Sequence, residues 1–524
     1  MDAPPSWEKL LQATAHWPPA AKRVAAWTDW LLVGALVVYL LANVPFLVAW
    51  PAVNGDEGRE MNAFWVASGL DPSARNLDPV FQHDPLYKGG LQGLSAAISF
   101  RLSGFGLLQG RIVSLLWGGL LLWFTFLCGR RLYGPTTGGI GVLFLAASQP
   151  FLVSSHIVRP DIVVAALVMA ALYCALRGLQ DGARVWHLVA GLLLGLSFDV
   201  HPNTIAFIPM VGLCYVLRLG RRVLASSESW LFAGGLLIGA LYYVGARVLP
   251  DPRHYLEAFA YWVGIDKRPP VLATRGAPAL LAELWRWHQY FVHRLAELAL
   301  LAIGVLAAIW RLAQGREIPV SRRLDPLLVG LVAAFVVFVL LVNSKTEFYM
   351  ILFFPVLVLL LAAAIAEVGS QLVPGGRLVG AALLVILAVS AMGFEDNFRD
   401  VVEAASDFRE RDYSVLSSQL QAQIPAGSKV VAPPVYWIGL AQPPYYLDYV
   451  DFYVWERVRR ERSMSWPEFL REIDPDYVVL DPKAKYDVTR STPRFMEDNA
   501  ELVTQIKHVN YGLVQVWKIR GATR

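Results

Sequence analysis

Charged residues are scarce in this chain of 524 residues: 17% are Asp, Glu, Lys or Arg, whereas 56% are hydrophobic. Soluble proteins carry about 25% charged residues, so the composition excludes an ordinary soluble protein. A net charge of +4 over this length leaves no basic surface of the kind that binds nucleic acid. Apolar runs instead recur at about 18 residues or more, the length that crosses a hydrocarbon core. The sequence therefore predicts a polytopic α-helical membrane protein.

Cysteine is rare as well, and phosphate-binding glycine loops are missing. Cys128, Cys174 and Cys214 all lie within apolar runs and lack the spacing of metal ligands, which excludes a disulfide framework and a zinc site. The glycines within residues 104–110 have the wrong spacing for a dinucleotide turn, and the sequence contains no P-loop. Nothing in the chain therefore predicts nucleotide binding.

Apolar runs predict about eleven transmembrane helices. The first run is followed by no small-residue cleavage site, so we expect it to be retained as a membrane anchor. The predicted spans cover residues 28–50, 108–128, 138–155, 162–178, 185–199, 204–219, 230–249, 291–310, 326–342, 348–366 and 378–394.

Lys and Arg residues predict the orientation in the plasma (inner) membrane. If residues 1–27 are a cytoplasmic N-terminal segment, every inner loop is positive, as the positive-inside rule requires. Two long loops, 51–107 and 250–290, and the C-terminus are then extracytoplasmic. We interpret residues 86–107 as amphipathic helices on the outer surface, because a further span would break this charge bias.

The character of the sequence changes at about residue 395, where charged residues and proline return and the spans stop. We expect residues 28–394 to form the membrane domain and residues 395–524 to form a soluble, extracytoplasmic α/β domain. Its predicted helix is Trp466–Ile473, and its predicted strands are Lys429–Val431, Tyr477–Leu480, Leu502–Val509 and Leu513–Ile519.

Carboxylates follow two of the predicted outer span ends. Asp56 and Glu57 come directly after the first span, and Arg159-Pro160-Asp161 follows the third. One interpretation is structural: the acidic pair is hydrated loop, and Asp161 is a cap beside a helix-starting proline. The other is a reaction centre at the outer membrane surface. The residues alone are compatible with both.

These motifs, together with residues 87–91 and 129–134, follow in the order seen in GT-C glycosyltransferases. Over roughly residues 28–365 the chain resembles most the branch of the protein O-mannosyltransferases and the aminoarabinose transferases that modify lipid A. The resemblance implies a GT-C fold, a polyprenyl-phosphate-linked sugar as donor, and inversion at the anomeric carbon. The acceptor would be a hydroxyl of a glycolipid, lipid A, a polymer or a protein.

The resemblance also implies roles for the acidic residues. An inverting transfer needs a carboxylate that takes the acceptor's proton and cations that stabilise the departing phosphate. Asp56 would be the catalytic base, and Asp161 would orient the acceptor or assist Asp56. Glu57 would hold the donor sugar or the acceptor, and the guanidinium of Arg159 would bind substrate beside them.

Further substrate-binding residues follow from the same resemblance. Lys88 matches the lysine of the family's tyrosine-x-lysine-proline-proline pattern, although both prolines are glycine here, and the alternative is a snorkelling lysine. Lys345 and Tyr349 resemble a second phosphate-binding pair, the alternative being interfacial anchoring. His201 would bind a sugar or cap a helix, with capping favoured. Arg253 and His254 lie in the second long loop, where the aminoarabinose transferases supply an arginine that binds the phosphate. The resemblance therefore makes these two residues candidates for phosphate binding.

No cofactor is predicted to be required. Asp56, Glu57 and Asp161 could host a divalent cation, but the branch that the chain resembles does not generally need one. Two alternatives belong to other function classes. A transporter or flippase of lipid-linked sugars would carry charges in the middle of its spans, and these are almost absent. An assembly protein would use the spans only as an anchor, for which eleven are excessive.

Overall fold

The structure, a computed structural model, divides the chain into two compact units. We call Met1–Ala42, Ser114–Ser155 and Pro160–Asp400 the helical unit, and Asn43–Val113, His156–Arg159 and Val401–Arg524 the α/β unit. The structure describes residues 19–68, 90–253, 255–256, 285, 287–288, 290–292, 294–314, 325–342, 347–372, 398–440, 445–447, 465–485 and 494–520.

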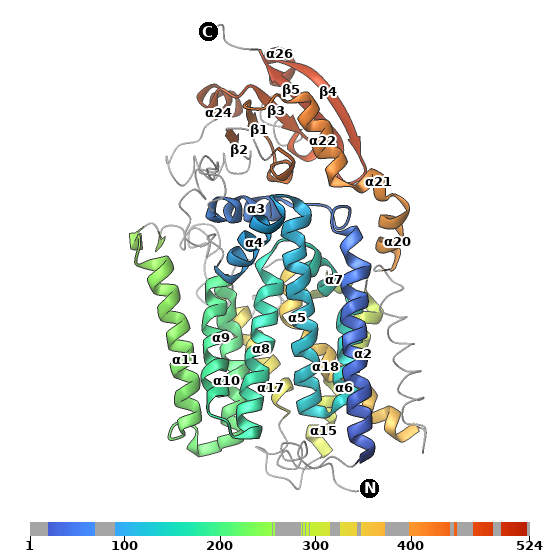
Figure 1. Cartoon of the computed structure of the whole chain (residues 1–524), viewed down its shortest axis with the longest axis vertical. Helices are drawn as coiled ribbons and strands as arrows, with labels where there is room; N and C mark the ends of the chain where they lie inside the picture. The colour runs from blue at the N-terminus through green and yellow to red at the C-terminus, as the bar shows by residue number, and fades with distance from the viewer. Residues whose placement is uncertain are drawn as a thin grey trace. The chain divides into compact units, whose positions relative to one another are not determined.

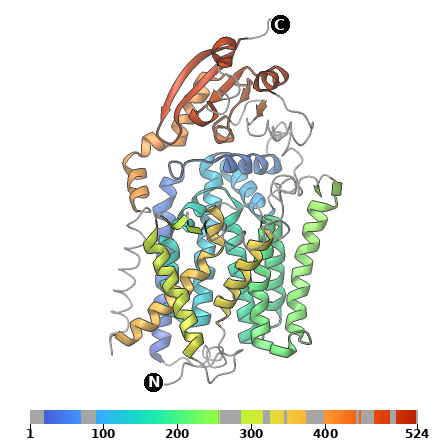
Figure 2. The same ribbon diagram turned by 180° about the vertical axis from the view of Figure 1, so that it is seen from behind.

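The described part of the helical unit consists of helices that run side by side (Figures 1 and 2). The α-helices are α2 (Pro19–Asn43), α5 (Leu107–Tyr133), α6 (Pro135–Ala147), α7 (Gln149–His156), α8 (Pro160–Asp181), α9 (Val185–Val200), α10 (Ile208–Leu219), α11 (Ser227–Tyr243), α15 (Leu295–Gln314), α17 (Pro326–Leu341) and α18 (Phe354–Leu372). The first residues of α5, up to Val113, belong to the α/β unit. Shorter segments are η3 (Pro202–Phe207), η5 (Val244–Val248) and η6 (Glu347–Leu352).

Five segments in the described part of the chain are long and apolar enough to cross a membrane, and the pair α6 and α7, bent by 66°, would be a sixth. These five contain α5, α8, α10, α11 and α15, while α2, α9, α17 and α18 carry shorter apolar stretches. Each predicted span from 28–50 to 348–366 contains a helix, although the helix does not always fill the span: residues 47–50, for example, form turns and a bend. Residues 378–394 lie outside the described residues, so the number eleven stays a prediction.

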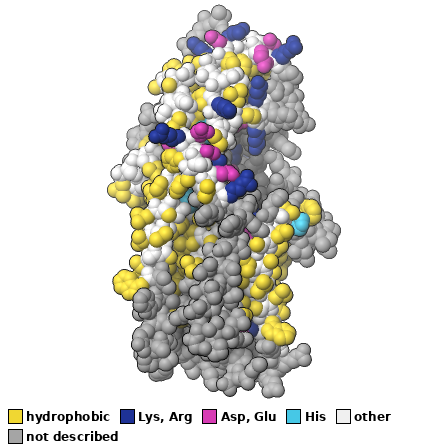
Figure 3. Space-filling view, turned by 90° about the vertical axis from the view of Figure 1, so that its right-hand side faces the viewer, with side chains coloured by type: hydrophobic (Ala, Val, Ile, Leu, Met, Phe, Trp, Pro, Cys, Tyr) yellow, Lys and Arg dark blue, Asp and Glu magenta, His cyan; other side chains and the backbone are white. Residues whose placement is uncertain are grey.

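Burial separates central helices from peripheral ones. In α8, 83% of the most apolar window is buried, compared with 22% in α11 and in α15. Large hydrophobic side chains such as Trp30, Val38 and Leu41 of α2 are exposed. Figure 3 shows hydrophobic side chains over the helices on the face turned to the viewer. Exposed apolar helix faces are what a lipid-facing surface requires.

Helices α9 and α11 approach one another through two pairs of glycines with small-x-x-x-small spacing. A Cβ atom on Gly191 of α9 would collide with the carbonyl oxygen of Phe232, and one on Gly195 would lie 2.7 Å from that of Leu236. On α11, a Cβ on Gly239 would lie 2.5 Å from the carbonyl carbon of Gly195. Small residues at this spacing let backbones touch, which stabilises helix pairs in membranes.

We expect Gly235→Ala on α11 to lower the thermal unfolding midpoint in detergent, because the added methyl group would collide with the carbonyl oxygen of Leu188 on α9. Overpacking of this kind costs about 1–3 kcal/mol. Gly234→Ala is the matched control: its Cβ would meet no atom within 4 Å. Alanine favours a helix by about 1 kcal/mol over glycine in both variants, so only the collision separates them. Equal midpoints for the two variants would contradict this packing.

The α/β unit contains a five-stranded sheet of order β2-β1-β3-β5-β4. Strand β1 pairs in parallel with β2 and β3, whereas β5 pairs antiparallel with β3 and β4. The strands are β1 (Lys429–Val431), β2 (Tyr445–Leu447), β3 (Tyr477–Leu480), β4 (Ala500–His508) and β5 (Gly512–Ile519). The four predicted strands and the predicted helix, α24 (Trp466–Ile473), are confirmed, and β2 was missed. A capping box between Ser465 and Glu468 explains where α24 begins.

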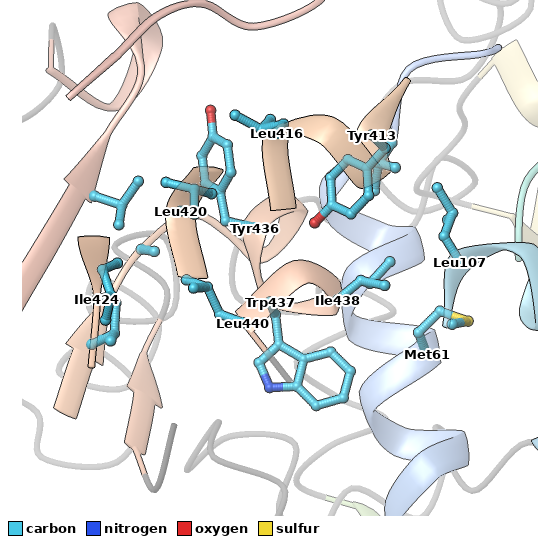
Figure 4. Packing of buried hydrophobic residues seen from close by; sticks show 14 of the residues in the cluster. Met61, Leu107, Tyr413, Leu416, Leu420, Ile424, Tyr436, Trp437, Ile438 and Leu440 are labelled. Carbon is cyan, nitrogen blue, oxygen red and sulfur yellow. The ribbon is translucent and has the colours of Figure 1, made fainter. Parts of the chain in front are cut away.

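The first loop contributes two helices to the α/β unit. The helices of this unit are α3 (Gly55–Ser68), α4 (Gly90–Ser103), α20 (Phe398–Ser406, which begins at the unit boundary), α21 (Phe408–Arg411), α22 (Tyr413–Gln423), α24 and α26 (Phe495–Asn499), with short turns at η8 (Pro434–Tyr436) and η9 (Ile438–Leu440). Met61 of α3 belongs to one buried cluster with Tyr413, Leu416, Trp437 and Ile438 (Figure 4). Helix α4 has 14 residues, too few to span a membrane, and its place on the outer surface stays a prediction.

The compact units therefore cut the chain differently from the predicted domains. The prediction grouped residues 51–107 with the membrane domain, because hydropathy indicates where spans begin and end but not which segments pack together. The contacts group these residues with the C-terminal segment, since α3 and α4 bury apolar side chains in its core. The predicted boundaries at residues 27 and 394 stay a prediction about the membrane.

Candidate active site

The acidic motif after α2 begins helix α3. The side-chain oxygen of Asn54 accepts a hydrogen bond from the backbone N–H of Glu57 at 2.9 Å, which is the geometry of a helix cap. Asp56 and Glu57 lie in the first turn, where the helix dipole favours negative charge. The motif is thus a fixed helix start and not a hydrated loop, and Asp56 is presented from a rigid backbone.

Asp56 is a partly exposed carboxylate held by arginine. It forms an ion pair with Arg159 through Oδ2, and its Oδ1 lies 3.5 Å from Arg59 of the next turn. The Asp56 side chain keeps 44% of its surface accessible, whereas Arg159 is buried with 7%. The pair therefore leaves the carboxylate open to a ligand while its charge is balanced from the protein side.

Glu57 differs from its neighbour Asp56 in burial. Its side chain is completely buried, and both carboxylate oxygens accept hydrogen bonds from the equally buried guanidinium of Arg111. Its Oε1 also accepts the backbone N–H of Val158 at 2.9 Å. These contacts leave Glu57 no open position toward a sugar, so its predicted contact with donor or acceptor has no support in this geometry.

Sequence reasoning missed Arg111. It lies in the first turns of α5, at the start of an apolar run that was interpreted only as a span. A signal was present in Gly110: a Cβ there would lie 2.9 Å from Cε of Met61 and 3.0 Å from Cγ2 of Val158. Gly110 thus lets the start of α5 approach α3 closely, which is a packing role.

Asp161 lies in the first turn of α8, within the helical unit, and is 2% exposed. Pro160 is the first residue of α8, so the predicted helix-starting proline is confirmed. Asp161 follows that proline inside the helix and does not occupy the cap position. Along the chain it stands two residues from Arg159, the partner of Asp56.

Two other predicted residues meet in the helical unit. The rings of His201 and Tyr349 pack edge to face with centroids 5.7 Å apart. Nδ1 of His201 accepts the backbone N–H of Asn203 at 3.1 Å and caps η3, which confirms the favoured capping role. This ring contact brings two predicted residues from different parts of the chain together within the helical unit.

Arg253, a predicted phosphate-binding residue, is exposed, and its role stays a prediction. Arg247, six residues earlier, is buried in the π-helical segment η5, and its Nε donates to Oδ1 of Asp199 at 2.5 Å. Sequence reasoning did not single out Arg247, because an arginine at the end of an apolar run also suits an interfacial anchor. Short π-helical turns are frequent at functional sites.

Three predicted residues, Lys88, Lys345 and His254, lie outside the described residues, so their roles stay predictions. Within the described ranges, no three His, Cys, Asp or Glu side chains gather as metal ligands would.

A sequence model of the dolichyl-phosphate-mannose-protein mannosyltransferase family matches residues 92–244, which include Arg111, Arg159 and Asp161. No protein with curated annotation matches the chain. Among solved structures, ArnT from Cupriavidus metallidurans bound to undecaprenyl phosphate has a TM-score of 0.60 at 16% identity, covering 94% of this chain and 98% of that one. The oligosaccharyltransferase of Archaeoglobus fulgidus has a TM-score of 0.52 at 14% identity, covering 87% and 69%.

The chain is similar in fold to GT-C glycosyltransferases. The expected resemblance to the protein O-mannosyltransferase and aminoarabinose transferase branch is thereby confirmed. At these identities the similarity concerns the GT-C fold, and the chemistry has to be argued from the site.

Proposed function

We propose that the protein is an inverting glycosyltransferase that moves a sugar from a polyprenyl-phosphate donor to an acceptor hydroxyl. The observation that carries the proposal is Asp56: an accessible carboxylate on the first turn of a fixed helix, paired with a buried arginine, in a chain with the GT-C fold. ArnT, a structure of similar fold, was solved bound to undecaprenyl phosphate, which supports a donor of this class.

The reaction assigns one task to each group. The acceptor oxygen attacks the anomeric carbon while its proton passes to the Asp56 carboxylate. The bond between the anomeric carbon and the phosphate oxygen breaks, and its electron pair leaves with the polyprenyl phosphate. Cations stabilise that departing charge, and Lys88, Lys345 and Tyr349 are our proposed phosphate-binding residues, with Arg253 and His254 as weaker ones. Asp161 would orient the acceptor.

Arg159 limits the freedom of the base. An ion pair with a buried guanidinium fixes the direction of the Asp56 carboxylate. We propose that the acceptor approaches the accessible side of Asp56, away from Arg159. No metal ion is needed for these steps.

The proposed location follows from the charge distribution. Positive inner loops support an integral protein of the plasma (inner) membrane with a cytoplasmic N-terminus, about eleven spans, and an extracytoplasmic active site and C-terminal domain. An enzyme on that side has no nucleotide sugar, and a lipid-linked donor supplies the sugar there. The acceptor would be a glycolipid, lipid A, a polymer or a protein.

The test is to incubate purified protein with a panel of undecaprenyl-phosphate sugars and hydroxyl acceptors, and to measure free undecaprenyl phosphate. We expect protein-dependent release with at least one donor. The alternative, a transporter or flippase, predicts movement of the same lipids between vesicle leaflets with no bond cleaved. Movement without release would overturn the proposal.

A further inference from the structure

Arg111 joins three segments of the α/β unit. Its Nη1 donates to the carbonyl oxygens of Leu47 and Pro51 at 2.8 and 2.9 Å, in the stretch between α2 and α3. Its Nε and Nη2 donate to the two carboxylate oxygens of Glu57 at 2.7 and 2.6 Å. A guanidinium has five N–H donors in a rigid fork. Four of them are used here, in a place without solvent.

Glu57 carries the connection onward to the segment His156–Arg159. It accepts the N–H of Val158, the residue before Arg159, and Asp56 pairs with Arg159 itself. Two consecutive residues of α3 thus bind two consecutive residues of that segment. The first pair, Glu57 with Val158, is buried, whereas the second contains the accessible carboxylate.

The geometry of the helix links the direction of Asp56 to the buried contacts of Glu57. Successive residues of an α-helix point about 100° apart around its axis. Fixing the direction of Glu57 therefore fixes the rotation of α3 about its axis, and with it the direction of Asp56. A carboxylate bound by a bidentate arginine and a backbone N–H tolerates little rotation.

Stability alone does not account for the pair. Replacing a buried ion pair by apolar residues of similar volume is often neutral or stabilising. A buried pair that spans three segments is better explained by the geometry it imposes on them.

We infer that Glu57 and Arg111 are positioning residues that hold Asp56 in the direction of the acceptor. The inference rests on the proposed function. In this inference Glu57 acts by orienting helix α3, and it does not contact the sugar.

The experiment compares three variants with wild type in the polyprenyl-phosphate release assay. Glu57→Asp shortens the side chain by one methylene group and should loosen the bidentate contact with Arg111. The double variant Glu57→Leu with Arg111→Met replaces both charges by apolar side chains and avoids an unpaired buried charge. Arg101→Gln is the matched control, because Arg101 also donates to a carbonyl oxygen in this unit, that of Ser68 at 2.9 Å, without reaching Glu57.

The expected result for the double variant is a fall in kcat of about tenfold or more, with KM for the donor within about twofold of wild type. The kcat of Glu57→Asp should lie between those of the double variant and wild type, and the kcat of Arg101→Gln should match that of wild type. The pH profile should keep its shape at a lower plateau, because Asp56 still takes the proton.

Other outcomes overturn the inference. A folded double variant that keeps the wild-type kcat removes the positioning role. A raised KM with unchanged kcat, in either Glu57 variant, makes Glu57 a substrate ligand instead. Should the double variant fail to fold, Glu57→Asp decides by the same two criteria. A wild-type protein that releases no polyprenyl phosphate contradicts the proposed function itself, and is thereby distinguished from a failure of the positioning role alone.

Discussion

Asp56→Asn is expected to lower kcat of glycosyl transfer by at least about 100-fold, the scale on which a general base acts. Asparagine keeps the size and an oxygen that can accept from Arg159, but it cannot take the acceptor's proton. Because only the proton-accepting step is lost, KM for the donor should change little. The measurement is the rate of polyprenyl phosphate release at saturating donor and acceptor.

A second carboxylate in the α/β unit provides a close control for this substitution. Asp407 has a side chain that is 45% exposed and lies 3.8 Å from Arg411, much as the 44% exposed Asp56 lies beside Arg159. Asp407→Asn removes the same charge in a similar setting and should leave kcat unchanged. Turnover of Asp56→Asn at the wild-type rate would remove Asp56 from its role, and Asp161 would then be the next residue to replace.

Local sequence signals predicted most of the secondary structure. Helices such as α8 and α11 come from long apolar runs, and β3 comes from Tyr477–Leu480, whose side chains are all buried. Both signals lie within one continuous stretch of sequence, so the element can be predicted without knowing which other segments it packs against. Strand β2 was missed because it directly follows a proline pair, which is unfavourable for a strand.

Long-range pairing explains what the sequence did not reveal of the site. Arg111 lies 54 residues from Glu57, and Arg247 lies 48 residues from Asp199. In each case the arginine stands in an apolar run, where its charge indicates an interface, and its partner is fixed only by the packing of helices. Asp56 was identified from a motif, but the buried state of its neighbour Glu57 follows from contacts that no local pattern encodes.

The same reasoning applies to the boundary between the two compact units. Hydropathy predicts where α2 ends, yet it carries no information about which neighbours α3 packs against. Met61 and Phe64 of α3 are completely buried in one cluster with residues 413–440. The C-terminal segment is therefore part of the structure that supports the base, and this has a direct experimental consequence at Gly58.

Gly58→Ala is expected to lower kcat by about 100-fold. A Cβ on Gly58 would collide with the backbone carbonyl of Pro434 in η8, whose carbonyl carbon would lie 2.7 Å away. Neighbouring η8 residues cannot retreat easily, because Tyr413 donates to the carbonyl oxygen of Val435 at 2.6 Å and accepts the N–H of Gly439 at 3.1 Å. Helix α3 must therefore shift, and Asp56 shifts with it. A displacement of about 1 Å at a reacting group can cost about 100-fold in rate.

Gly55→Ala tests whether that loss comes from the collision. Gly55 lies in the same helix, next to Asp56, and its Cβ would meet only Cγ of Pro434, at an ordinary 3.9 Å. Neither substitution weakens the helix, and the gain in helix propensity is larger at the interior Gly58, so a lower kcat of Gly58→Ala comes from the contact with Pro434. We expect Gly55→Ala to keep kcat within about threefold of wild type. If the two variants turn over equally fast, the C-terminal segment does not set the position of α3, and Asp56 must be held by Glu57 and Arg159 alone.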